Sequence, residues 1–391
     1  MTAPARIVVA GASLAGLRSV EALRRLGHAG RITVLGAEPH LPYDRPPLSK
    51  EVLAGKWDAE RTALRKPESY AGLDAEWRLG TPATGLDLAG RAVLCGDERV
   101  PYDALVIATG SVPRRLPGPP LDGVHVLRTL EDALAIRRAF DAGARVAVVG
   151  AGFIGGEVAA TARGRGLSVT MIEALPAPLE RQLGAAMGAR VVELHRDHGV
   201  DLRVGVGVAA LEGHGRVERV RLGDGSCVDA DVVVVGIGVT PATGWLAGSK
   251  LALSDGVLCD AHCRASAPDV YAVGDVARWH HEGYAEHLRI EHWTNATEMA
   301  DAAAAALLAG SDACAPYAPV PYFWSDQFGV KMQLAGRALP GDVVTVVDGS
   351  LEERRFVALY HREGRLAAVL GWNRPRLVMQ YRRELREAGP I

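Results

Sequence analysis

Two short glycine-rich segments have the residue types and spacing that suit binding of a phosphate group. They are Gly11-Ala12-Ser13-Leu14-Ala15-Gly16 and Gly150-Ala151-Gly152-Phe153-Ile154-Gly155. Each follows an apolar stretch and precedes an amphipathic one, which predicts a sharp turn from a strand into a helix. The N–H groups and positive dipole end of such a helix can receive a pyrophosphate, and glycine lets the backbone approach it. The chain is therefore expected to hold two nucleotides.

An acidic residue follows each loop at the end of the next predicted strand. These residues are Glu38 and Glu173. A carboxylate in this place can accept both hydroxyls of an adenosine ribose, and it would repel a 2′-phosphate. No arginine follows Glu173 until Arg181, so the second loop favours NADH over NADPH. A solvated loop acid is the other interpretation of either residue.

The order strand, helix, strand surrounds both loops. The predicted elements are residues 6–10, 14–26 and 31–35 around the first loop and residues 145–149, 154–165 and 168–172 around the second. Two later stretches, Ala104 to Gly110 and Val270 to Asp275, look like strand ends that return to the first site. The sequence therefore predicts an α/β fold with two Rossmann-like dinucleotide-binding domains, one inserted in the other.

After about Pro316 the chain becomes aromatic and alternating, which predicts a small antiparallel sheet with a terminal helix. This part would form a small C-terminal α+β domain. The expected boundaries are residues 1–112 and 240–316 for the first nucleotide domain, 113–239 for the second and 317–391 for the last.

Composition excludes several classes of protein. The chain has 391 residues, 48% of them hydrophobic, and a net charge of −2, which gives no general attraction to nucleic acid or to an anionic membrane. Its 5 cysteines are scattered without metal-ligand spacing, so we expect no disulfide framework, no metal and a reducing cytoplasm. The histidines at 280, 281, 287 and 292 also lack the spacing of a helix-face metal pair.

Several blocks together resemble the flavoprotein ferredoxin reductases of bacterial oxygenase systems, of the putidaredoxin reductase type, in the glutathione-reductase-like superfamily. The resemblance covers nearly the whole chain. Its blocks are Pro42-Tyr43-Asp44-Arg45-Pro46-Pro47-Leu48-Ser49-Lys50, Ala108-Thr109-Gly110, the second loop extended to Gly156-Glu157, Gly236-Ile237-Gly238-Val239-Thr240-Pro241, Gly274-Asp275, and Pro321-Tyr322-Phe323-Trp324-Ser325-Asp326-Gln327.

The resemblance implies FAD on the first loop and NADH on the second. The residues it places at FAD are Gly11, Ser13, Leu14, Ala15, Gly16, Glu38, Arg45, Lys50, Ala83, Thr109, Gly110, Arg128, Gly274, Asp275, Trp293 and Trp324. Those it places at NADH are Gly150, Gly152, Ile154, Gly155, Glu157, Glu173, Gly236, Ile237 and Gly238. Asp275 would bind the ribityl chain, and Trp324 would border the nicotinamide side of the flavin.

Lys50, Glu157 and Trp324 are the residues expected to act in catalysis. Lys50 and Glu157 look like the family's ion pair beside the reactive edge of the flavin, where a positive group can steady a reduced, anionic ring. A purely structural salt bridge is the alternative. Ser13 departs from the pattern, because the second glycine of the first loop normally lies there; its hydroxyl would donate to phosphate instead.

The function implied is NADH:ferredoxin oxidoreduction, in which hydride passes from NADH to FAD and single electrons pass to an iron–sulfur ferredoxin. That ferredoxin would serve an oxygenase, and a haem-thiolate monooxygenase is the expected type. No cysteine occurs before Cys95, so the thiols of disulfide reductases are missing and electrons must leave the flavin directly. The alternatives are a rubredoxin reductase and a non-enzymatic FAD/NADH redox sensor.

Arginines near the C-terminus suggest where the partner docks. Arg374, Arg376, Arg382, Arg383 and Arg386 are interspersed with few acids and would form a positive patch for an acidic ferredoxin. A solvated helix face is the alternative. We expect a cytoplasmic monomer that binds neither nucleic acid nor membrane.

Overall fold

The computed structural model describes residues 4–310 and 313–389, and the chain divides into two compact units. Unit 1 contains Met1–Asp44, Ala63–Val112 and Thr240–Tyr322, and unit 2 contains Arg45–Thr62, Pro113–Val239 and Phe323–Ile391. Two short strands, β8 (Ser111–Pro113) and β17 (Val239–Pro241), each contain one of the junctions.

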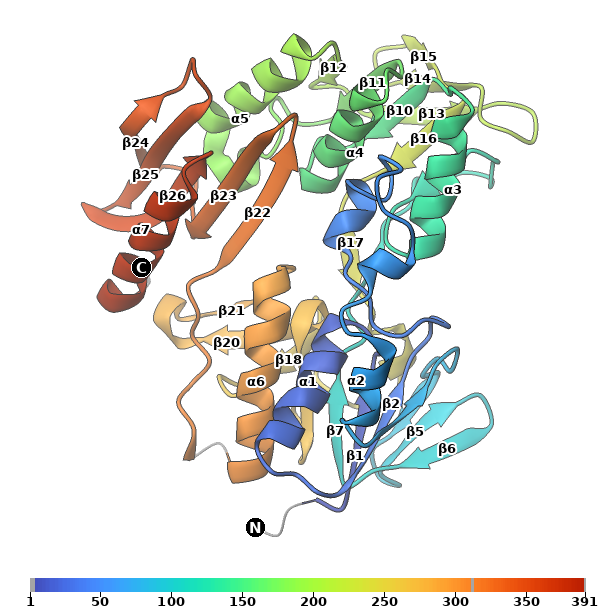
Figure 1. Cartoon of the computed structure of the whole chain (residues 1–391), viewed down its shortest axis with the longest axis vertical. Helices are drawn as coiled ribbons and strands as arrows, with labels where there is room; N and C mark the ends of the chain where they lie inside the picture. The colour runs from blue at the N-terminus through green and yellow to red at the C-terminus, as the bar shows by residue number, and fades with distance from the viewer. Residues whose placement is uncertain (1–3, 311–312, 390–391) are drawn as a thin grey trace. The chain divides into compact units, whose positions relative to one another are not determined.

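The centre of unit 1 is a parallel sheet of five strands in the order β19-β7-β1-β2-β3. Its strands are β1 (Arg6–Ala10), β2 (Arg31–Leu35), β3 (Ala75–Arg78), β7 (Ala104–Ile107) and β19 (Val270–Ala272). Four of the five residues of β1 are buried, as expected of an interior strand in a parallel sheet that is covered on both faces. Helices α1 (Leu14–Arg25) and α6 (Trp293–Ala309) lie side by side in this unit (Figure 1).

Smaller elements complete unit 1. They are α2 (Pro67–Ala71), an antiparallel group of β4 (Gly85–Asp87), β5 (Ala92–Cys95) and β6 (Glu98–Pro101), and a group of β18 (Val257–Cys259), β20 (Ala277–His281) and β21 (Glu286–Leu288), with the 3-10 turns η3 (Gly244–Leu246), η4 (Gly274–Val276) and η5 (Glu282–Tyr284). The two groups of strands share one hydrophobic core with the sheet.

Unit 2 contains a second parallel sheet, with strands in the order β12-β11-β10-β16-β9. The strands are β9 (Val124–Val126), β10 (Val146–Val149), β11 (Val169–Glu173), β12 (Asp201–Val204) and β16 (Val232–Val235). The helices are α3 (Leu130–Asp141), α4 (Phe153–Gly164) and α5 (Glu180–Asp197), and β13 (Val208–Glu212), β14 (Arg219–Leu222) and β15 (Cys227–Asp229) form an antiparallel group. β16 is four buried valines, as suits an interior strand.

The last part of unit 2 is a five-stranded sheet in the order β22-β23-β26-β25-β24, followed by a helix. Its elements are β22 (Tyr322–Gln327), β23 (Val330–Gly336), β24 (Val343–Ser350), β25 (Arg355–Arg362), β26 (Arg365–Trp372) and α7 (Pro375–Ala388). Leucines of α5 share a hydrophobic core with this sheet, and the Tyr360 hydroxyl donates to the Leu183 carbonyl at 2.8 Å. The sheet and α7 carry the orange and red end of the chain (Figure 1).

The predicted fold class is confirmed. Both strand–helix–strand units form around the glycine loops, and their helices begin and end within one residue of the predicted bounds. The C-terminal sheet and helix also form. The sequence did not reveal that residues 45–62, with the 3-10 turns η1 (Pro46–Ser49) and η2 (Glu60–Thr62), lie with unit 2.

Candidate functional site

The first glycine loop joins β1 to α1 at the carboxyl edge of the unit 1 sheet. Gly11 has φ +123°, and a Cβ there would lie 2.2 Å from the Ala108 carbonyl oxygen. A Cβ on Gly16 would lie 1.9 Å from the Gly11 carbonyl oxygen. Both positions therefore exclude a side chain, because real Cβ atoms do not come so close to a carbonyl. This close approach of strand, turn and helix is the cradle that a dinucleotide requires.

Ser13 occupies the N-cap of α1. Its backbone is extended, and its hydroxyl makes no capping hydrogen bond to the helix, whose first turn contains no acidic residue. The first turn, from Leu14 to Ala15 and Gly16, therefore keeps its N–H groups for a ligand. A serine in the place of the second glycine is compatible with phosphate at this helix end.

Other expected FAD residues meet the same edge. A Cβ on Gly274 would lie 3.1 Å from the Cβ of Ala15, so the η4 turn lies against the start of α1. In that turn Asp275 accepts a hydrogen bond from the Ser111 hydroxyl at 2.9 Å, and the Thr109 hydroxyl before Gly110 donates to the Ala242 carbonyl at 3.0 Å. Because the carboxyl ends of parallel strands share an edge, β1, β7 and β19 bring these residues together.

Glu38 follows β2 and accepts a hydrogen bond from the Tyr43 hydroxyl. Trp293 begins α6, and its indole Nε1 donates to Asp44 at 2.8 Å. Ala83 is partly buried against the unit 1 core. All belong to unit 1, whereas the expected FAD residues Arg45, Lys50 and Arg128 belong to unit 2. There Arg45 donates to the Arg128 carbonyl.

The second glycine loop repeats the geometry of the first in unit 2. Gly150 has φ +97°, and a Cβ there would lie 2.4 Å from the carbonyl oxygen of Gly236, which Ile237 and Gly238 follow. A Cβ on Gly155 would lie 2.0 Å from the Gly150 carbonyl oxygen. Around Gly152, by contrast, no atom lies within 4 Å of the added Cβ, so space remains at the helix end for a phosphate. Ile154, in the first turn of α4, is 43% exposed.

Glu173 ends β11 and holds the second loop in place. One of its oxygens accepts the Ala151 N–H and the other accepts the Leu175 N–H, both at 2.8 Å. A carboxylate has about four acceptor sites, so two remain for the hydroxyls of a ribose. Sequence reasoning identified the residue but not this structural role, which only the folded turn makes visible.

Lys50 and Glu157 form an ion pair within unit 2. The Lys50 Nζ lies 2.8 Å from Glu157 Oε2, and the two side chains are 15% and 7% exposed. Lys50 follows the η1 turn and Glu157 lies in α4. The Ser49 hydroxyl also donates to Oε2, and the Ser325 hydroxyl donates to Oε1 at 2.8 Å. The sequence pointed to the pair but not to the two serines.

Trp324 lies in β22 and is half-buried. The next residue along that strand, Ser325, is fully buried. The alternation expected of a strand thus turns one side chain toward the ion pair and its neighbour to the other face.

Two of the five cysteines are unsuited to reaction. Cys259 and Cys263 are buried in unit 1, and burial raises the pKa of the Cys259 thiol to about 12. In residues 4–310 and 313–389, no three histidines, cysteines or acids are placed to hold a metal ion. The rings of His280 and His287 lie edge to face, with their centroids 5.3 Å apart.

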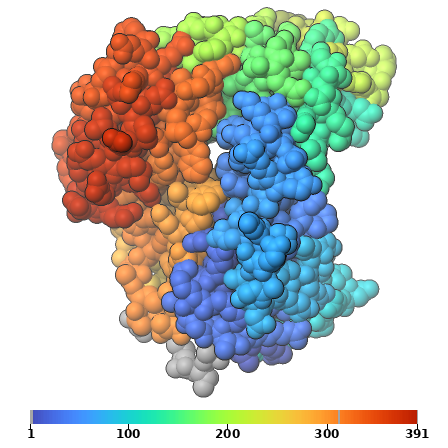
Figure 2. Space-filling view, in the orientation of Figure 1, coloured from blue at the N-terminus to red at the C-terminus, as the bar shows by residue number. Residues whose placement is uncertain are grey.

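The C-terminal arginines differ in environment. Arg374 pairs with Asp348 at 2.6 Å and Arg382 is 8% exposed, whereas Arg376, Arg383 and Arg386 are exposed on α7. The red end of the chain, which includes α7, forms part of the surface on the face that Figure 2 shows. The positive patch predicted from five arginines therefore rests on three.

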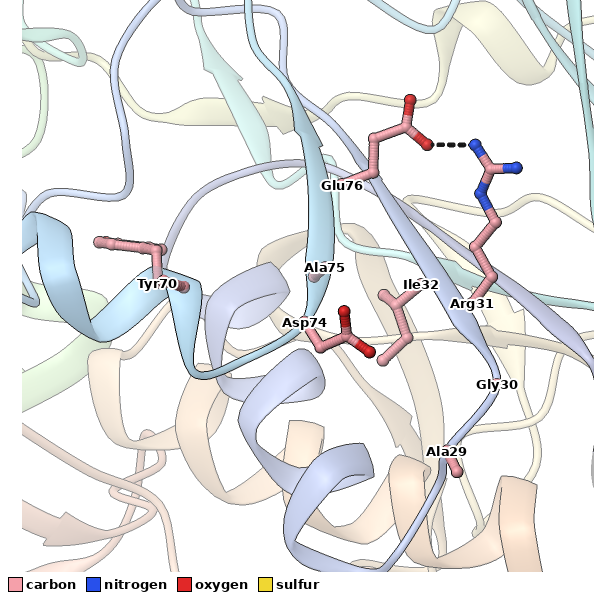
Figure 3. A pocket seen from close by; sticks show the side chains of 9 residues that line it. Ala29, Gly30, Arg31, Ile32, Tyr70, Asp74, Ala75 and Glu76 are labelled. Atoms are coloured by element: carbon pink, nitrogen blue, oxygen red, sulfur yellow. Dashed lines mark hydrogen bonds and ion pairs between the residues drawn. The ribbon is translucent and has the colours of Figure 1, made fainter.

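Figure 3 shows an open hollow in unit 1. It is lined by the starts of β2 and β3, including Arg31, Ala75 and Glu76, and by Tyr70 of α2. Arg31 and Glu76 form an exposed ion pair at its rim. Because dinucleotides bind at the carboxyl ends of parallel strands, this hollow is not the expected cofactor site.

Comparison with known proteins gives a consistent result. Residues 5–300 match the family described as pyridine nucleotide-disulphide oxidoreductase, and residues 322–391 match the reductase C-terminal domain. The chain belongs to this family of flavoprotein oxidoreductases.

Named relatives within the family are ferredoxin reductases. A probable ferredoxin reductase of Castellaniella defragrans is 39% identical and covers 94% of this chain and 90% of the relative. Putidaredoxin reductase of Pseudomonas putida is 37% identical, over 96% of this chain and 90% of its own length. The solved complex of putidaredoxin reductase with putidaredoxin contains a chain that is 36% identical, with a TM-score of 0.92, over 98% of this chain and 93% of that one.

Within the described residues, no helix is both long and apolar enough to cross a membrane.

Proposed function

We propose that this chain is an NADH:ferredoxin oxidoreductase. The observation that carries the proposal is the pair of glycine loops, one in each unit, at which a Cβ would strike a backbone carbonyl. Membership of a flavoprotein oxidoreductase family and relatives named as ferredoxin reductases support it. The chemistry that FAD supplies when bound is acceptance of a hydride from NADH and release of electrons one at a time.

We assign FAD to residues 1–112 and 240–316 and NADH to residues 113–239, with residues 317–391 as the C-terminal domain. The first turn of α1 would receive the pyrophosphate of FAD, Glu38 would accept the ribose hydroxyls, and Asp275 would bind the ribityl chain. The η4 turn that follows β19 lies close to the first turn of α1, since a Cβ on Gly274 would lie 3.1 Å from the Cβ of Ala15.

NADH would bind at the first turn of α4. Glu173 already has both oxygens on the loop backbone, so its negative charge is fixed beside the expected ribose position. A 2′-phosphate would be repelled there, which supports NADH as the donor. Lys50, held by Glu157, would present a positive charge to the flavin, and Trp324 would border it.

Electrons would pass to an iron–sulfur ferredoxin that supplies an oxygenase. A haem-thiolate monooxygenase is the expected type of oxygenase. No cysteine precedes Cys95, and the buried thiols of Cys259 and Cys263 are poor nucleophiles because their pKa values are raised; both observations support direct transfer from the flavin. The exposed arginines of α7 would meet the acidic partner. We place the protein in the cytoplasm as a monomer.

Anaerobic stopped-flow spectroscopy tests this proposal. The purified protein is mixed with NADH or NADPH, and then with a panel of ferredoxins, while the flavin absorption is followed. We expect rapid bleaching by NADH, slow bleaching by NADPH and reoxidation by a ferredoxin. A protein without flavin, or one that NADH does not bleach, would refute it.

A further inference from the structure

A chain of buried hydrogen bonds begins at Glu157 and runs through β22 to α5. Ser325 donates to Glu157 Oε1 at 2.8 Å, the Gln327 amide Nε2 donates to the Ser325 oxygen at 3.1 Å, and Gln327 Oε1 lies 2.8 Å from His195 Nε2. All four residues are buried. All of them belong to unit 2.

The direction of every bond in this chain is fixed by the carboxylate. An ionised carboxylate can only accept, so the single hydroxyl hydrogen of Ser325 goes to Glu157. The serine oxygen must then accept from the Gln327 amide, which turns the amide oxygen to His195. His195 therefore carries its hydrogen on Nε2. Its Nδ1 is buried with no partner in the described residues, consistent with a neutral ring.

Glu157 has no acceptor site left for a ligand. Oε2 accepts from the Ser49 hydroxyl and from Lys50, and Oε1 accepts from the Ser325 hydroxyl and, at 3.3 Å, from the Asp326 N–H. These four donors occupy all of the acceptor sites of a carboxylate, which number about four. Lys50, by contrast, uses one of its three N–H donors on Glu157. The arrangement leaves the ammonium available and the carboxylate enclosed.

Gly156, which precedes Glu157, leaves space for this series of hydrogen bonds and not for a phosphate. A Cβ on Gly156 would lie 2.7 Å from both polar atoms of the Gln327 amide. That amide is bonded at both ends and 1% exposed, so it cannot easily move aside. Gly156 therefore provides the space in which β22 reaches Glu157.

From this geometry we infer that Ser325 of the C-terminal sheet is a positioning residue. It fixes one oxygen of Glu157 so that the other faces Lys50, and Gln327 orients the Ser325 hydroxyl from behind. The inference rests on the proposed function for its effect on flavin reduction. It gives the C-terminal sheet a part in the hydride step, separate from any contact of Trp324 with the flavin.

The test compares Ser325→Ala, Glu157→Gln and the double variant with wild type. Ser19→Ala is the matched control, because its hydroxyl is equally buried but donates to the Ala15 carbonyl. For Ser325→Ala we expect a limiting rate of reduction by NADH lowered about tenfold, which is about 1.4 kcal/mol, with the NADH concentration at half-maximal rate unchanged within about twofold. If Ser325 had only a structural role, its replacement would lower stability without this lower limiting rate at an unchanged half-saturating NADH concentration.

In the double variant the rate should be no lower than in Glu157→Gln alone, because Ser325 acts through Glu157. A second readout without turnover is the urea midpoint of the same four proteins, in which the two substitutions should again be less than additive. Additive effects in both cycles, or a Ser325→Ala rate equal to that of Ser19→Ala, would overturn the inference.

Two further results separate the possible failures. If NADH does not bleach the wild-type flavin, the proposed function fails, while the urea cycle still decides whether Ser325 and Glu157 are coupled. If Ser325→Ala does not fold, Gln327→Met replaces it. This variant leaves every donor to Glu157 in place, and we expect a smaller rate loss of about threefold; no loss would overturn the inference.

Discussion

Protonation of His195 should destabilise the folded protein at mildly acidic pH. The ring is 1% exposed, and burial lowers its pKa from 6.5 to about 4. In the folded chain the neutral ring donates from Nε2 to Gln327, and a second proton on Nδ1 would have no partner in the described residues. Lowering the pH should therefore favour unfolding, because the unfolded chain takes up this proton more readily than the folded chain does.

The size of the effect follows from the two pKa values. Between pH 6.5 and pH 4 the unfolded chain binds the proton and the folded chain does not, so the free energy of unfolding falls as pH is lowered through this window. The full loss is about 3 kcal/mol below pH 4, and about 2 kcal/mol of it has occurred at pH 5. At neutral pH the penalty is absent.

Urea unfolding of the FAD-loaded protein at pH 7 and pH 5, at one fixed FAD concentration, measures this loss. His195→Gln keeps an amide that can donate to Gln327 but removes the titrating ring, so its stability should fall about 2 kcal/mol less between the two pH values. His214→Gln, at an exposed position, should behave as wild type. Equal pH dependence in wild type and His195→Gln would refute the reasoning.

Three further outcomes are expected. Glu173→Arg should move the ratio of kcat/KM for NADH over NADPH at least about tenfold toward NADPH, because it exchanges a repulsive charge for a phosphate partner; an unchanged ratio would exclude Glu173 from the ribose site. Asp275→Ala should weaken FAD binding about tenfold by titration of the apoprotein, and full flavin affinity would remove Asp275 from the site. Reversing the exposed charges in Arg376→Glu/Arg383→Glu should raise KM for ferredoxin, most strongly at low salt, and leave reduction by NADH unchanged; an unaltered KM would place docking elsewhere.

The elements around the glycine loops could be predicted because their signals are local. A run such as Ile7-Val8-Val9-Ala10 is buried on both faces of a parallel sheet. The glycine that follows marks a turn that no side chain allows, as the 2.2 Å approach of a Cβ on Gly11 to Ala108 shows. The start of α1 at Leu14 is as predicted, whereas its end and both ends of α4 lie one residue earlier than predicted; Gly152 makes no side-chain cap that would mark the start of α4 in the sequence.

The contacts that organise each site could not be predicted, since they join segments distant in the chain. Glu173 was expected at a ribose, and its bonds to the Ala151 and Leu175 N–H groups depend on the exact path of the loop. The sequence predicts one patch of arginines near the C-terminus, but in the structure Arg382 is buried and Arg374 pairs with Asp348. Charge in a sequence does not tell which side of a helix is covered.

Glu157 shows most clearly what the fold adds to the motif. In the sequence it is an acid beside a glycine loop, equally suited to bind, to exchange protons or to pair with a lysine. Once its two oxygens accept from two serines, one lysine and one backbone N–H, a hydrogen bond to a cofactor would require breaking one of these. A buried carboxylate that loses a donor loses stability, so the role left to Glu157 is to fix the charge of Lys50. The effect of removing Glu157 should therefore be the effect of misplacing Lys50, and a search for proton transfer at this carboxylate would look in the wrong place.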